Sequence, residues 1–410
     1  MSSCGRLLVK EASQSSLKSN KPMLIRNLKV SHLLSFGPTG IDLPMRPLNV
    51  LIGANGSGKS NFVEVLSLLK SAPRELSEPI KAMGGVREWL WKDRGRSHEA
   101  LIEVSVSHPG GQMGLRHILA FGENGMRFEV TDETIENELP YAYSEGDTNP
   151  YYRYNRGNPA VRDGIEAERK LPREQVRPEE SILSQLKDPE RYPELARLQD
   201  VYSEIRFFRN WCFGPNASFR REQSTHGRSD FLSDGGENLA LVLSKIRNRL
   251  GTELLVSMQK LFDGIKTIGF EIDGGNVQMF LEEADGRFIP AARLSDGTLR
   301  YLALLAILLH PEPPPLIVIE EPELGLHPDV IPHIAELLQK ASARTQLVVT
   351  THSRVLVDAL GDDPECVVVC EKHNGQSTFE RLDGPRMQDW LTRYSLGELW
   401  SIGELGGNRW

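Results

Sequence analysis

The chain has 410 residues, of which 39% are apolar and 25% charged, and its formal net charge is −8. This composition is typical of a folded globular protein with one large domain or two ordinary ones. The negative charge excludes a surface that is basic throughout, so any DNA contact would be a local patch. The longest uncharged apolar run, residues 301–309, is too short to cross a bilayer. The N-terminus shows no secretory leader and the four cysteines no CxxC pair, so we expect a cytoplasmic protein without membrane contact.

The first third of the chain predicts a polar tail followed by strands, a glycine-rich loop and a helix. Residues 1–22 are rich in Ser and Lys, and we expect them to be disordered. Strand patterns at 24–30 and 48–52 lead into the loop GANGSGKS at 53–60, and apolar residues at helical spacing follow it. Further strand patterns continue to residue 130, so we assign residues 23–130 to the first part of an α/β domain.

The middle of the chain, residues 131–263, predicts an insertion. Its first part is polar and turn-prone, whereas residues 181–263 are mostly of helical pattern. In that helical part five arginines alternate with four aromatic residues, and they form either a local DNA-binding patch or a solvated face over an aromatic core. The residues concerned are Arg206, Arg209, Arg220, Arg221 and Arg228, with Phe207, Phe208, Trp211 and Phe219.

The last part, residues 264–410, begins with short strands and then alternates helices with strands. Such alternation predicts a parallel sheet with crossover helices. The expected elements are a helix at 298–310, a strand at 316–320, a helix at 331–341, a strand at 347–351, a helix at 353–360 and a strand at 366–370. The predicted fold class is therefore α/β, with a mixed sheet, flanking antiparallel strands and a helical insertion lobe.

The loop at 53–60 has the spacing of a phosphate-binding loop. Its glycines allow backbone N–H groups to surround a phosphate at the N-terminus of the following helix. Lys59 would reach the β- and γ-phosphates and Ser60 would bind Mg²⁺; the alternative is a simple glycine-rich turn. The predicted nucleotide-binding residues here are Gly53, Ala54, Asn55, Gly56, Ser57, Gly58, Lys59, Ser60 and Asn61.

Two adjacent glutamates end the apolar strand of LIVIEEPE. A near-continuous apolar strand is typical of a parallel sheet, and ligands bind at the carboxyl ends of such strands. Glu320 would hold Mg²⁺ through water, and Glu321 would polarise the attacking water. The alternative is that the two acids are a solvated edge or loop.

Two further motifs, LSDGT and TTHS, come before and after the paired acids. Ser295 and Gly297 begin a long apolar helix, where Ser295 alone would be an ordinary N-cap. His352 follows a predicted strand, and a lone His at such a place is more often structural. Its distance from the paired acids favours a role at the same site.

Together these motifs resemble the RecF/SMC-like branch of ABC ATPases, the small predicted ATPases called RecF-like or AAA_21. The resemblance covers LKVSHLLSF to GKSN and most of residues 231–410, including ELGLHPD. It implies that Ser295 and Gly297 are the signature that contacts ATP held by a second subunit, and that His352 is the switch histidine. Glu320 stands where the family usually has Asp. The family's Q-loop glutamine has only a weak candidate, Gln112.

The resemblance implies an ATPase that uses ATP and Mg²⁺ and forms a homodimer on ATP binding. Relatives of this branch act on DNA, so we expect a role in DNA repair or chromosome maintenance. An alternative is an ATPase scaffold or sensor of a defence system that controls a separately encoded effector. A transporter subunit is disfavoured, because ELGLHP differs from the transporter-type loop.

Overall fold

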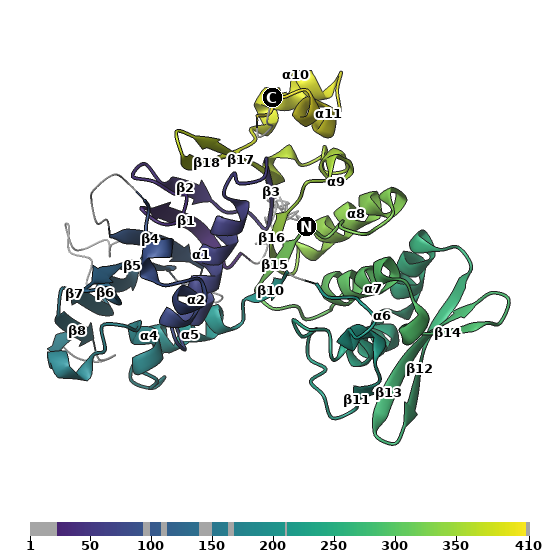
Figure 1. Ribbon diagram of the computed structural model, residues 1–410, viewed down its shortest axis with the longest axis horizontal. Helices are drawn as coiled ribbons and strands as arrows, with labels where there is room; N and C mark the ends of the chain where they lie inside the picture. Colours follow the sequence, from purple (N-terminus) through teal and green to yellow (C-terminus); the bar gives the residue numbers. More distant parts are fainter. Residues whose placement is uncertain are drawn as a thin grey trace, which may run out of the picture.

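The computed structural model describes residues 23–92, 99–107, 113–138, 150–162, 168–209 and 211–406. The predicted disordered tail, residues 1–22, lies outside these ranges. Three β-sheets with flanking helices make up the described part (Figure 1). Within the described residues, no helix combines the length and apolar character needed to cross a membrane.

The central sheet has six strands in the order β10-β15-β16-β3-β17-β18. The first five are parallel, and β18 is antiparallel to β17. Their bounds are β10 (Arg206–Phe208), β15 (Leu316–Glu320), β16 (Gln346–Thr350), β3 (Leu48–Ile52), β17 (Val367–His373) and β18 (Gln376–Arg381). Helices α7 (Asp296–Leu308), α8 (Ile331–Ala341) and α9 (Arg354–Asp358) alternate with these strands. The predicted parallel sheet with crossover helices is confirmed.

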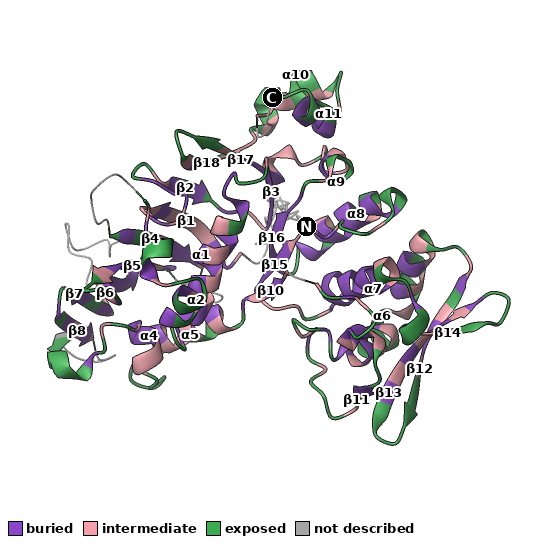
Figure 2. Cartoon of the chain, in the orientation of Figure 1, coloured by how far each residue is buried: buried purple, intermediate pink, exposed green. Residues whose placement is uncertain are grey.

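Residues of the central strands alternate between two hydrophobic cores, because successive side chains of a strand point to opposite faces. Ile317 and Val349 belong to one core, with α7 and α8. Val318 and Val348 belong to the other, with α1 (Lys59–Ser71) and the eight-stranded sheet. Figure 2 shows β16 and β3 buried along their length, and β15 is buried up to its last residue, Glu320. Burial on both faces fixes these strands and therefore the loops at their carboxyl ends.

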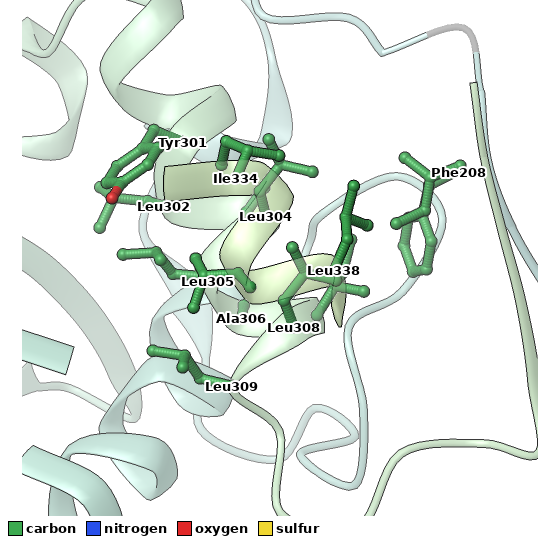
Figure 3. Close-up of a cluster of buried hydrophobic side chains, with 14 of the residues drawn as sticks. Phe208, Tyr301, Leu302, Leu304, Leu305, Ala306, Leu308, Leu309, Ile334 and Leu338 are labelled. Carbon is green, nitrogen blue, oxygen red and sulfur yellow. The ribbon is translucent and has the colours of Figure 1, made fainter. Parts of the chain in front are cut away.

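The apolar side chains of α7 form the centre of the first core. Figure 3 shows Leu304, Leu305 and Leu308 from this helix beside Ile334 and Leu338 of α8. Each is at most 1% exposed. Complete burial of one such side chain stabilises the fold by about 1.5–3 kcal/mol. The N-terminus of α7 is thereby held rigidly against the sheet.

The second sheet has eight antiparallel strands in the order β2-β1-β4-β5-β6-β7-β8-β9 and covers α1 (Figure 1). Its strands are β2 (Ile41–Pro44), β1 (Ile25–Ser31), β4 (Ala100–Val106), β5 (Leu115–Asn124), β6 (Arg127–Asn137), β7 (Tyr152–Asn155), β8 (Asn158–Arg162) and β9 (Glu168–Lys170). The helices beside it are α2 (Ser77–Ala82), α3 (Val86–Trp89), α4 (Ile182–Gln185) and α5 (Pro193–Ser203). The predicted flanking antiparallel strands are confirmed.

The third sheet packs on the long helix α6 (Leu239–Leu261). Its strands are β11 (Gln223–Ser224), β12 (Ile265–Asp273), β13 (Asn276–Glu283) and β14 (Phe288–Pro290). Two short helices, α10 (Gly384–Leu391) and α11 (Leu396–Ser401), follow the central sheet. The 3₁₀ helices are η1 (Arg173–Gln175), η2 (Ser218–Arg220), η3 (Ala291–Arg293), η4 (Pro328–Val330) and η5 (Pro364–Cys366).

The range 131–263 differs in detail from the sequence-based expectation. Residue 131 lies inside β6, and the range holds five strands besides its helices within the described residues. One of these strands, β10, forms an edge of the central sheet. The pattern of three buried or half-buried residues in β10 is too short to distinguish a strand from a helix. The division of the chain at residues 130 and 263 stays a prediction.

Candidate functional site

The glycine-rich loop at 53–60 joins β3 to α1, as predicted. Gly53, Gly56 and Gly58 have φ angles of 148°, 78° and 107°, which residues with a side chain rarely adopt. A Cβ atom at Gly53 would lie 2.2 Å from the carbonyl oxygen of Cys370, and one at Gly58 would lie 2.3 Å from Ser377 Oγ. The loop can therefore keep this shape only with glycine at both positions, and its amides lie at the N-terminus of α1.

Lys59 is buried against its own loop. Its Nζ donates hydrogen bonds to the carbonyl oxygens of Gly53 (2.7 Å) and Ala54 (3.1 Å). Burial lowers the pKa of Lys59, and the nearby charge of Glu321 opposes this effect. The ammonium group thus lies at the concave side of the loop, where a phosphate would be bound.

The residues on either side of Lys59 differ in exposure. Ser57 is buried, whereas Asn55, Gly56 and Ser60 are exposed and so accessible to a ligand. The Asn61 side chain donates to Ser35 Oγ (2.7 Å), which also accepts from Ser377 Oγ (2.7 Å). The structure therefore places Asn61 as a brace between α1 and the neighbouring loops.

The paired acids lie at the carboxyl end of β15, next to β16 and β10. Glu320 is the last strand residue, opposite Thr350 of β16. Glu321 has a φ of 46° and donates its N–H to the carbonyl oxygen of Thr350 (2.9 Å). A positive φ is uncommon for a residue with a side chain, and such residues occur in turns and at functional sites. This turn directs Glu321 away from the path of the strand.

The carboxyl group of Glu320 is half-buried among charged neighbours. Burial raises its pKa, the charge of Arg209 lowers it, and the carboxylates of Glu64 and Glu321 raise it. A divalent cation bound beside this carboxyl group would favour its ionised form. Ser60 and Glu320 both offer oxygen ligands of the kind that Mg²⁺ prefers.

His352 faces Glu321 across the carboxyl edge of the sheet. Its Nε2 lies 3.9 Å from Glu321 Oε1. Burial lowers the pKa of His352, and the charge of Lys59 lowers it further. The structure therefore brings Lys59, Glu321 and His352 together, although β3, β15 and β16 come from distant parts of the chain.

Sequence reasoning did not single out Glu323, which joins two of the motifs. Its Oε1 accepts hydrogen bonds from Thr351 Oγ1 (2.6 Å) and from the His352 N–H (3.0 Å). The loop that follows the paired acids is thus fixed to the segment that carries His352. The only sequence signal was the position of Glu323 inside the ELGLHP motif.

Ser295 is the N-cap of α7, as its sequence context predicts. Its Oγ accepts the N–H of Thr298 (3.0 Å), and the residue is exposed. A Cβ atom at Gly297 would lie 2.7 Å from the carbonyl oxygen of Gly325. The signature segment therefore lies against the loop that follows the paired acids. The cap fits both interpretations of Ser295, because the exposed side would be available to a second copy.

Two arginines that were not predicted to belong to the nucleotide site hold this segment. Arg300 is buried, donates to the carbonyl oxygen of Leu324 and lies 5.4 Å from the Trp211 ring. Arg220 forms an ion pair with Asp296 and donates to backbone carbonyl groups nearby. Both contacts join residues far apart in the sequence, so no local pattern indicates them.

Most of the arginines proposed as a DNA patch are engaged within the protein. Ion pairs join Arg209 to Glu64 and Arg228 to Asp230, in addition to the pair made by Arg220. Among the aromatic residues, Trp211 stacks on Phe219 and lies tilted against Phe208. The structure thus favours the second interpretation, a polar face over an aromatic core. Gln112, the weak candidate for the Q-loop, lies outside the described residues.

The model of the AAA_21 family, described as "AAA domain, putative AbiEii toxin, Type IV TA system", matches residues 48–358. An SmcHead bound to the C-winged helix domain of ScpA is similar over 89% of this chain and 100% of its own, with a TM-score of 0.53 and 13% identity. No curated protein matches this chain.

A second solved structure agrees with the first. The Smc head domain from Pyrococcus furiosus with an extended coiled coil, bound to the C-terminal domain of ScpA, is similar over 90% of this chain and 98% of its own. Its TM-score is 0.52 and its identity 12%. At such identities the likeness shows the fold, which is that of Smc head domains.

Proposed function

We propose that this chain, which belongs to the AAA_21 family of AAA domains, hydrolyses ATP at sites shared between two copies of itself. The observation that carries the proposal is the carboxyl edge of the central sheet. There the loop of Lys59, the turned carboxylate of Glu321 and the imidazole of His352 meet from three strands. A phosphate-binding loop beside an acid that can orient water is the arrangement that phosphoryl transfer requires.

Different groups would hold the phosphates and the Mg²⁺ ion. The amides of the glycine-rich loop and the ammonium group of Lys59 would bind the β- and γ-phosphates. Ser60 and Glu320 would hold Mg²⁺, which neutralises charge between the phosphates when it is bound. Glu320 is one methylene longer than the aspartate usual in this family, and binding through water tolerates that difference.

Glu321 is proposed as the group that polarises the attacking water. Its backbone turn and its hydrogen bond to Thr350 fix where the side chain begins. The 3.9 Å between its carboxylate and His352 places a second polar group at the same position. General acid–base assistance of this kind contributes about 10²–10⁴-fold to a rate.

The exposed cap of α7 supports the proposal of a composite site. Ser295 and Gly297 lie at a helix N-terminus, which favours anions, and Ser295 is exposed. The ATP site of one copy would therefore be completed by Ser295 of another copy. This is tested by measuring the ATP turnover per chain and, by light scattering on the same samples, the fraction of dimer. We expect both to rise together with protein concentration, whereas constant turnover by monomers would contradict composite sites.

For the biological output we propose that the ATP-bound dimer acts on DNA, in repair or in chromosome maintenance. The support is the ABC-type head fold. The arginines near Trp211 add little to it, because Arg209, Arg220 and Arg228 are paired with carboxylates. Stimulation of ATP turnover by DNA at low and at high salt tests the proposal, because contacts with phosphates weaken steeply as salt increases. Turnover that is insensitive to DNA at both salt concentrations would contradict it.

A second candidate output is the control of a separate effector in a defence system. It is favoured by the family description, which names a toxin of a type IV toxin–antitoxin system. Co-expression with the product of a neighbouring gene, followed by purification with and without ATP, tests this candidate. A complex whose stability depends on ATP would support it, and the absence of any complex would contradict it.

A further inference from the structure

Arg209 lies at the carboxyl edge of the central sheet, beside the acids of the proposed ATP site. β10 pairs in parallel with β15, and Phe208 is opposite Ile319. The next residues in this register are Arg209 and Glu320. Since the carboxyl ends of parallel strands lie at the same edge, Arg209 reaches the site from the strand that borders the paired acids.

The Arg209 side chain spans from β10 to α1. Its Nη1 lies 2.5 Å from Oε1 of Glu64, and both side chains are largely shielded from solvent, at 28% and 17% exposure. Glu64 is four residues after Ser60 on α1, so both lie on the same face of that helix. The guanidinium group also lies 5.6 Å from the Phe207 ring. The ion pair therefore joins the end of β10 to the face of α1 that also carries Ser60.

Arg209 is also the main positive charge acting on Glu320. Its charge opposes the effects of burial and of the Glu64 carboxylate on Glu320. Two carboxylates, Glu64 and Glu320, thus lie near a single guanidinium group. Charges that are shielded from water are screened only weakly by salt. The charges of Arg209, Glu64 and Glu320 would therefore also act on a nucleotide bound beside them.

We propose that Arg209 is a positioning residue of the ATP site, which pairs with Glu64 and offsets the carboxylates beside the terminal phosphate. This inference rests on the proposed function, because it requires ATP at the loop of Lys59. Without the guanidinium group, Glu64 and Glu320 would both repel the phosphates. ATP carries one more negative charge than ADP, and it would lose more affinity. Arg209 would thereby favour ATP over ADP before Mg²⁺ is bound.

The test is calorimetric titration of ATP and of ADP, with EDTA present so that no divalent ion contributes. We expect Arg209→Gln to raise the Kd of ATP relative to that of ADP by about three- to tenfold, which is the size of effect that one unit charge has near a protein surface. Glu64→Gln should shift the ratio in the opposite direction. The double variant Arg209→Gln/Glu64→Gln removes one charge of each sign and should return the ratio close to that of wild type. Arg209→Lys, which keeps the charge, should preserve most of the preference.

Arg206→Gln is the matched control, because Arg206 lies in the same strand at its amino end, opposite Ile317. It should leave the ATP/ADP ratio unchanged. A merely structural role of Arg209 would lower the thermal midpoint or weaken both nucleotides equally, and an unchanged ratio in Arg209→Gln would overturn this inference alone. If Arg209→Gln does not fold, an unchanged ratio in Glu64→Gln overturns it in the same way. Failure of the wild type to bind ATP would instead overturn the proposed function.

Discussion

Glu323 connects the loop after the paired acids to the strand end that carries His352. Its Oε1 accepts from both the Thr351 hydroxyl and the His352 amide. Because Gly325 lies two residues further on, against Gly297 of the signature segment, the same short loop contacts both motifs. A change at Glu323 should therefore affect catalysis without touching the phosphate-binding loop.

We expect Glu323→Ala to lower ATP turnover about tenfold or more while the Kd of ATP stays within about twofold, because a small displacement of catalytic groups is costly. The variant should also lose about 1–3 kcal/mol of stability, since two donors lose their acceptor. Steady-state turnover, nucleotide titration and thermal melting measure the three effects. Glu323→Gln keeps a carbonyl oxygen for the same hydrogen bonds and is the control. Equal loss of turnover in both variants would indicate that the charge, not the hydrogen bonding, is required.

Lys59→Ala should weaken ATP binding by about 10- to 100-fold, since hydrogen bonds to charged groups contribute about 1.5–3 kcal/mol. In the structure Lys59 Nζ also donates to the backbone carbonyl groups of Gly53 and Ala54, so the variant loses these two contacts within the loop as well. Fluorescence titration with Mg²⁺ and ATP measures the affinity. Affinity close to that of wild type would refute the assignment of the phosphate-binding loop.

Glu321→Gln should bind ATP normally but hydrolyse it about 10²- to 10⁴-fold more slowly, because the amide keeps the shape and cannot assist the water. The slow variant should accumulate as an ATP-bound dimer, which light scattering detects. The isosteric change Glu320→Gln is the comparison. It should raise the Mg²⁺ concentration that turnover requires. If Glu321→Gln turns over normally, the catalytic role belongs to another residue at this edge.

The motifs and the parallel sheet were predictable because their signals are local. The glycine spacing of 53–60 requires positive φ angles, and the burial of residues 316–319 on both faces gives a continuous apolar run. The helix that Ser295 caps follows from its apolar spacing and from the capping hydroxyl. In each case the residues that determine the structure are adjacent or within a few turns.

The contacts that join the motifs could not be predicted from one sequence. Arg209 and Glu64 are 145 residues apart, and Arg300 meets a backbone carbonyl group, which has no sequence signature. Glu323 looks like any exposed acid of a loop until β16 places Thr351 beside it. The order of the strands in the central sheet decides which of the many charged residues lie at the site, and the composition of the sequence does not reveal this order.

Ser295 provides the sharpest test, because it separates a helix cap from half of a partner's site. As a cap alone, Ser295→Arg should cost about 1 kcal/mol of stability, with ATP affinity and turnover unchanged. In a composite site the same change places a bulky cation at the exposed N-terminus of α7, where the second copy would have to close. ATP should still bind through Lys59 and Ser60, yet turnover should collapse.

Mixing experiments then decide between the two. In a heterodimer of Ser295→Arg with Lys59→Ala, one site pairs the intact loop of the first copy with the intact signature of the second, and the other site combines the damaged loop with the damaged signature. One site is complete, so composite sites predict turnover in the heterodimer that neither variant shows alone, and no recovery would contradict them. A heterodimer of Ser295→Arg with wild type keeps one complete site and should retain partial turnover, measured with differently tagged copies purified together. Turnover of each copy that is independent of its partner would refute the dimeric mechanism while leaving ATP binding intact.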